Sequence, residues 1–94
     1  MSKYKTLLKE YKEEIDEIKE LKVAMRALAT EANQYVGLNS DKIDDLQVVY
    51  SNLHKEYADK TSALRHEIEV EYHDAVNREA AQKGMDKFWE LAFS

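Results

Sequence analysis

The sequence predicts an all-α protein: a long antiparallel helical hairpin of the coiled-coil type with a short C-terminal amphipathic helix, which forms a bundle by dimerisation. The 94 residues contain no proline and only two glycines, so the chain lacks the tight turns that sandwiches and barrels need. Apolar residues recur at about every 3.5 positions over two long stretches, which is helical spacing. A chain of this length forms a single domain.

The first helix is expected over residues 4–36, where one apolar stripe extends from Tyr4 to Tyr35. Leu8 and Val23 lie beside this stripe and make it wider than a two-stranded contact requires, so we expect this helix to pack against more than one neighbour. The stripe residues assigned to the core or to an oligomer contact are Leu7, Tyr11, Ile15, Ile18, Leu21, Met25 and Leu28.

A turn is expected at residues 37–40. Gly37 can adopt the left-handed conformation that ends many helices, and Asn39 is a favourable N-cap residue. So short a link makes the flanking helices antiparallel neighbours, and residues that face each other should have numbers that sum to about 77. This register places Tyr35 near Lys42.

The second helix is expected over residues 41–83, with Gly84 as its stop. Its stripe consists of Ile43, Leu46, Tyr50, Leu53, Tyr57, Leu64 and Ile68. At about 1.5 Å per residue this helix would be roughly 65 Å long and the first roughly 50 Å, so its last part has no partner in the hairpin. Residues 74–94 must therefore fold back as a third helix, dock on a second copy, or bind another protein.

A C-terminal helix is expected over residues 85–93, and its apolar face is the predicted partner-binding element. Aromatic side chains that fill a pocket dominate the energetics of many protein interfaces. The residues of this face are Met85, Phe88, Trp89, Ala92 and Phe93. The sequence thus indicates a non-enzymatic protein-interaction module: an assembly or scaffold subunit, or an adaptor or inhibitor of a larger complex. Its expected partners are a second copy, in a homodimer, and a larger protein complex.

The composition argues against several other functions. A formal net charge of −5 disfavours binding to nucleic acid or to an anionic membrane surface, which both require basic patches. The chain has no cysteine and no apolar run long enough to span a bilayer, and we expect it to be cytoplasmic. No serine or threonine lies in a setting typical of a catalytic nucleophile, so we expect neither an enzyme nor a cofactor.

Two alternatives rest on charged residues. His66, Glu69 and His73 lie close to one helix face and could hold a divalent metal in a helical bundle, although histidines at this edge of the hairpin would also pack against tyrosines. The acidic surface could instead imitate nucleic acid and inhibit a DNA-binding protein. Lysines are interleaved with the acids along the first helix, however, whereas mimicry requires a continuous negative stripe.

A third alternative comes from the turn tripeptide Tyr35-Val36-Gly37 in a hairpin of 94 residues. In topology and in this tripeptide the chain resembles the WXG100 family of small secreted proteins. The resemblance implies a hairpin that dimerises and is exported by a specialised secretion system. The chain departs from the family pattern because tyrosine replaces tryptophan. It also lacks the Tyr-x-x-x-Asp/Glu export signal, since Thr61 follows Tyr57 and Val76 follows Tyr72 at the fourth place.

Overall fold

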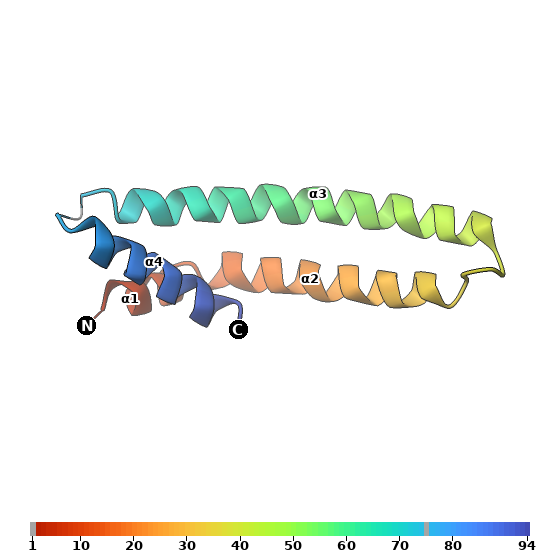
Figure 1. The fold of residues 1–94 in the computed structure, drawn as a ribbon, viewed down its shortest axis with the longest axis horizontal. Helices are drawn as coiled ribbons and strands as arrows, with labels where there is room; N and C mark the ends of the chain where they lie inside the picture. The colour runs from red at the N-terminus through yellow and green to blue at the C-terminus, as the bar shows by residue number, and fades with distance from the viewer. Residues whose placement is uncertain (1, 75) are drawn as a thin grey trace.

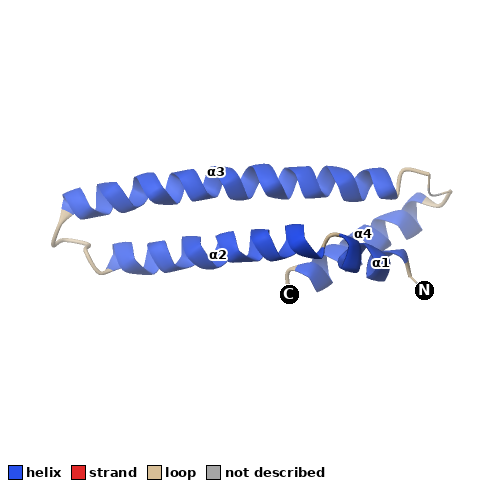
Figure 2. Cartoon of the chain, turned by 180° about the vertical axis from the view of Figure 1, so that it is seen from behind, coloured by secondary structure: helices blue, strands red, loops and turns tan. Residues whose placement is uncertain are grey.

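The structure is a computed structural model that describes residues 2–74 and 76–94. This part of the chain forms four helices and no strand, which confirms the all-α fold class: α1 (Lys3–Glu10), α2 (Lys12–Asn33), α3 (Ser40–Glu71) and α4 (Arg78–Ala92). Helices α2 and α3 form a long antiparallel hairpin, while α1 and α4 pack against each other beside one end of it (Figure 1). Figure 2 shows the same arrangement from behind, with α1 in front of α4.

The hairpin turn covers residues 34–39. Gly37 has a φ of 78°, a conformation that side chains other than glycine rarely adopt. Asn39 caps α3, because its Oδ1 accepts a hydrogen bond from the Lys42 N–H at 3.0 Å. The expected register is confirmed: Lys60 Nζ lies 2.8 Å from Glu17 Oε2, and Lys42 Nζ lies 5.9 Å from the centre of the Tyr35 ring.

The helix predicted over residues 4–36 is in fact two helices that meet at Tyr11. Tyr11 has φ −102° and ψ 22°, outside the helical region. The Tyr11 N–H still bonds to the Leu7 carbonyl at 2.9 Å, and the Ile15 N–H bonds to the Tyr11 carbonyl at 3.0 Å. The break is therefore a local bend, and it directs α1 onto α4.

The prediction of a second helix over residues 41–83 is wrong at its end, since α3 stops at Glu71. The next helix starts at an N-cap, Asn77, whose Oδ1 accepts hydrogen bonds from the Glu79 N–H at 3.0 Å and the Ala80 N–H at 3.2 Å. Helix α4 thus begins seven residues before the predicted start at 85. From the sequence, residues 74–94 are expected to fold back, to dock on a second copy or to bind another protein. The residues of this segment that the structure describes fold back, because α4 packs against α1.

Gly84 has a different role from the predicted one, because it lies inside α4 and ends no helix. A Cβ atom at this position would lie 2.7 Å from the Tyr72 hydroxyl oxygen and 2.8 Å from a ring carbon. Such distances are shorter than van der Waals contact. Glycine at position 84 therefore allows the Tyr72 ring to pack directly against the α4 backbone.

The apolar core occupies one half of the hairpin. Its buried cluster draws on all four helices and consists of Leu7, Ile15, Ile18, Leu64, Ile68, Phe88 and Ala92. We call residues 12–21 and 57–71, together with α1 and α4, the covered half, and residues 22–56 the bare half. Leu46 is the only buried residue of the bare half.

The molecule is elongated, with extents of 57 × 22 × 18 Å. It exposes 6970 Å², whereas a typical folded monomer of this mass exposes about 5,600 Å². The additional exposed area comes from the bare half, where α2 and α3 pack against each other without a third helix. None of the described helices has the length and apolar character needed to cross a membrane.

Candidate protein-binding surface

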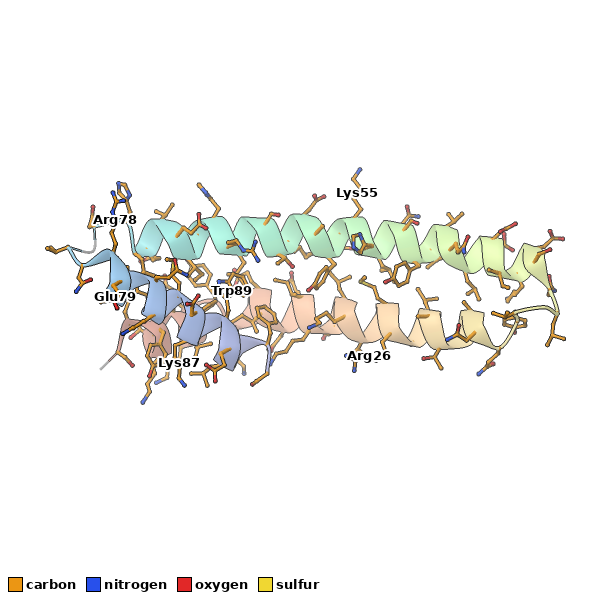
Figure 3. The ribbon with its side chains drawn as sticks, in the orientation of Figure 1. Arg26, Lys55, Arg78, Glu79, Lys87 and Trp89 are labelled. Atoms are coloured by element: carbon orange, nitrogen blue, oxygen red, sulfur yellow. The ribbon has the colours of Figure 1, made fainter. Side chains whose placement is uncertain are left out.

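The end of α4 is a cluster of aromatic rings. Trp89 meets Phe88 edge to face, with centroids 5.6 Å apart and planes at 87°. It also stacks on Phe93 at 5.2 Å and 18°. The Arg65 guanidinium lies 5.6 Å from the centre of the Trp89 ring, a cation–π distance. Trp89 lies between α4 and the hairpin (Figure 3), and its contact with Arg65 joins the end of α4 to α3.

The predicted partner-binding residues divide into two groups. Phe88 and Ala92 are buried in the chain's own core, so they have no surface left for a partner, and for these two residues we correct the prediction. Met85, Trp89 and Phe93 pack against that core and remain partly exposed. The accessible residues that adjoin the bare half are Trp89 and Phe93.

The predicted stripes divide in the same way along the hairpin. Leu7, Ile15, Ile18, Leu64 and Ile68 are buried in the core cluster, with Tyr11 and Tyr57 packed against it. In the bare half, Leu46 is buried and Tyr50 is exposed. The remaining stripe residues are half-buried: Leu21, Met25, Leu28, Ile43 and Leu53. The apolar stripe thus continues along both halves of the hairpin, but α4 completes its burial in one half only.

A hollow of about 250 Å³ opens where α4 ends, between α2, α3 and the aromatic cluster. Its lining includes Lys22, Tyr57, Thr61, Arg65, Trp89 and Phe93. The Thr61 hydroxyl oxygen is buried and has no hydrogen-bond partner among the described residues. Buried polar groups are usually paired, so this hydroxyl is an exception within the hollow.

A second hollow of about 340 Å³ continues along the bare half and shares Lys22 and Tyr57 with the first. Its other lining residues are Met25, Arg26, Ala29, Tyr50 and His54. The Tyr50 and His54 rings stack at 6.3 Å, and His54 lies 6.5 Å from Tyr57. The two hollows therefore form one surface with a floor of aromatic and apolar groups, which we call the basic groove.

The charge of the basic groove is opposite to that of the whole chain. Lys22, Arg26 and Arg65 line it, and its described lining includes no aspartate or glutamate, although the chain carries 19 acidic against 14 basic residues. Arg26 lies at the outer lip and its side chain points away from α3 (Figure 3). The groove combines an apolar floor with a cationic rim.

Three titratable groups with shifted pKa values lie in the covered half. Burial raises the pKa of Tyr11, and the carboxylates of Glu67 and Glu71 raise it further. Burial also raises the pKa of Tyr72, with an added contribution from Tyr4. The hydrogen bond to Glu17 raises the pKa of Lys60. In all three cases the fold favours the protonated form of the group.

Sequence reasoning named half of the groove residues, as stripe residues or as part of the aromatic face: Ile18, Met25, Tyr50, Tyr57, Trp89 and Phe93. It missed the basic residues, although a signal for them exists. Lys22, Arg26 and Ala29 are spaced i, i+4 and i+7, and a second series at helical spacing consists of Tyr50, His54, Tyr57, Thr61 and Arg65. Each series lies on one helix face, but only the fold shows that the two faces adjoin. The metal alternative finds no support: among residues 2–74 and 76–94, neither His66, Glu69 and His73 nor any other three His, Cys, Asp or Glu residues form a group that could hold an ion.

Comparison of the chain with protein-family models, with curated proteins and with solved structures finds no match in any of the three. The WXG100 resemblance thus rests on the hairpin topology and the tripeptide Tyr35-Val36-Gly37 alone.

Proposed function

We propose that this chain is a non-enzymatic protein-interaction module, acting as a scaffold subunit, adaptor or inhibitor in a larger complex. In this proposal the covered half maintains the fold, and the bare half with the exposed edge of the aromatic cluster contacts the partner protein. A homodimer and a cytoplasmic location remain predictions.

The observation that carries the proposal is that, among the described helices, α4 covers only one half of the α2–α3 hairpin. In the other half the groove between α2 and α3 continues, with its aromatic floor open to solvent. The chain exposes roughly 1,400 Å² more than a typical monomer of its mass, while a standard interface buries about 800 Å² on each partner. A partner helix on the bare half would complete the packing that α4 begins.

Site-specific photo-crosslinking in the native cell tests this proposal. A benzophenone amino acid replaces His54 in the groove or, as the control, its neighbour Lys55, whose side chain points away from the hairpin (Figure 3). We expect a discrete protein adduct from position 54 and none from position 55. Equal adducts from both positions, or no adduct from position 54, would contradict the proposal. Light scattering on the purified chain then determines whether a second copy is among the partners.

A further inference from the structure

We propose that the basic groove binds an acidic amphipathic helix that another protein contributes. This inference rests on the proposed function and specifies the chemistry of the partner. The partner helix would continue the line of α4 along the hairpin, with its apolar face on the groove floor and its carboxylates at the cationic rim.

The shape of the groove fits a helix. It follows α2 from Ile18 to Ala29 and α3 from Tyr50 to Arg65, a length of about 17–22 Å at 1.5 Å per residue, which corresponds to three or four helical turns. Trp89 and Phe93 of α4 line the adjoining end of the groove, so a helix already packs beside this surface. Apolar residues at i, i+3, i+4 and i+7 of the partner would contact the aromatic floor.

The charges at the rim select an acidic partner. Among the described residues, Lys22 and Arg26 take part in none of the ion pairs, and the Arg65 guanidinium contacts the Trp89 ring. The acids Glu17 and Glu56 contact Lys60, which does not line the groove. The unpaired side chains of Lys22 and Arg26 attract carboxylates and repel a basic helix.

Another cationic hollow lies near the start of α1, but its lysines are not unpaired. It is lined in part by Lys3, Lys83 and Lys87, but each of these side chains already has a partner. Lys3 donates to the Glu71 carbonyl and lies over the Tyr72 ring, while Lys83 and Lys87 form ion pairs on α4 with Glu79 and Glu90. Unpaired cations and an aromatic floor occur together in the basic groove.

A second copy of the chain is a poorer occupant. A symmetric dimer through this face would place one groove on the other, and because the lining holds three cations and no acid, every charge contact would be repulsive. The occupant with complementary charge is a helix of different sequence.

The test uses a synthetic helical peptide of about 15 residues, with leucines at heptad spacing and glutamates elsewhere, labelled with fluorescein and free of tryptophan. The control peptide carries lysine in place of each glutamate. Fluorescence anisotropy measures binding, and the single tryptophan of the chain, Trp89, reports occupation of the groove. We expect the acidic peptide to bind, to alter Trp89 emission and to bind more weakly as salt rises, and the lysine peptide not to bind.

Charge reversal then locates the site. The double variant Lys22→Glu/Arg26→Glu should weaken binding by more than about tenfold, while Lys55→Glu, which removes a cation outside the groove, should leave the affinity within about twofold. Circular dichroism checks the fold of each variant, and Lys22→Gln/Arg26→Gln replaces the charge reversal if that variant does not fold.

Several results would overturn the inference: equal binding of the two peptides, unchanged affinity of the double variant, or a dimer of the free chain that the double variant abolishes. If position 54 crosslinks to a protein but the acidic peptide does not bind, the inference fails and the proposed function stands. If position 54 yields no adduct, the proposed function fails, whether or not the peptide binds.

Discussion

Both halves of the α2–α3 hairpin carry an apolar stripe at helical spacing, but the two halves differ in what covers it. In the covered half, α4 places Phe88 and Ala92 against Ile18, Leu64 and Ile68, and all five are buried. In the bare half, only Leu46 is buried. An apolar stripe therefore does not determine its own burial, since α4 completes the core in one half and leaves a groove in the other.

The largest effect is expected from Phe88→Ala. This ring is completely buried, so its removal leaves a cavity and should cost about 3–5 kcal/mol of unfolding free energy. The matched change in the bare half, Leu28→Ala, removes a half-buried side chain and should cost about 1–2 kcal/mol. Urea denaturation followed by circular dichroism measures both. Similar losses would show that the two halves contribute equally to the free energy of unfolding. If Phe88→Ala does not fold, Phe88→Leu provides a milder change at the same position.

The two glycines provide the next test. Gly84→Ala favours the helix by up to about 1 kcal/mol, but its Cβ would lie 2.7 Å from the Tyr72 hydroxyl oxygen, and we expect a net loss of about 1–2 kcal/mol from overpacking. At Gly37, a Cβ meets no atom within 4 Å, yet φ is +78°, so Gly37→Ala should cost about 1 kcal/mol through backbone strain. Only the Gly84 variant should shift the emission of Trp89. A shift in the Gly37 variant would mean that the turn and α4 are coupled.

These two glycines also show what the sequence could and could not predict. Gly37 is a local stop signal followed by the N-cap Asn39, and the hairpin register follows from it, as the ion pair of Lys60 with Glu17 confirms. Gly84 looks the same in sequence, but its role depends on Tyr72, which is distant in the chain. A glycine that ends a helix and one that admits a neighbouring ring cannot be distinguished without the tertiary contact.

The other errors have related physical causes. Tyr11 interrupts the first helix although neither proline nor glycine is nearby, because α1 packs against α4, and no local signal records that contact. The end of α3 at Glu71 had a weak signal, Asn77 followed by Glu79, within a stretch that otherwise favours helix. The aromatic face of the tail was correctly recognised as apolar, but the burial of Phe88 depends on residues from three other helices.

Removal of the helix caps should lower the free energy of unfolding by less than Phe88→Ala does and by no more than the glycine substitutions do. Asn77→Ala deprives α4 of two side-chain hydrogen bonds, and Asn39→Ala deprives α3 of one, so each should cost about 1 kcal/mol. Loss of the Asn77 cap should also loosen α4 and shift Trp89 emission to longer wavelength, whereas loss of the Asn39 cap, at the bare end, should leave this emission unchanged. Thermal melts and fluorescence spectra measure the two effects, and identical spectra for both variants would contradict the separation of the halves.

The smallest effects concern the tyrosines of the covered half. The pKa values of Tyr11 and Tyr72 are raised in the fold, so the folded chain holds these protons more tightly than the unfolded chain. Their contribution to stability is complete below the ordinary tyrosine pKa of about 10 and is lost as pH rises through the higher folded values. The Tyr72 hydroxyl has no hydrogen-bond partner among the described residues, so Tyr72→Phe should change stability by no more than about 1 kcal/mol at neutral pH and reduce the alkaline loss. Denaturation curves at several alkaline pH values test this, and an unchanged alkaline loss in Tyr72→Phe would contradict it.

Amide hydrogen exchange, measured by NMR on the chain alone and with the acidic peptide, compares the stability of the two halves residue by residue. We expect residues 57–71 and 78–92 of the free chain to be the most protected and residues 22–56 to exchange through openings of lower free energy. The peptide should increase protection mainly in residues 18–29 and 50–65, which line the groove. Uniform protection of the free chain, or a peptide effect mainly outside the groove, would contradict these expectations.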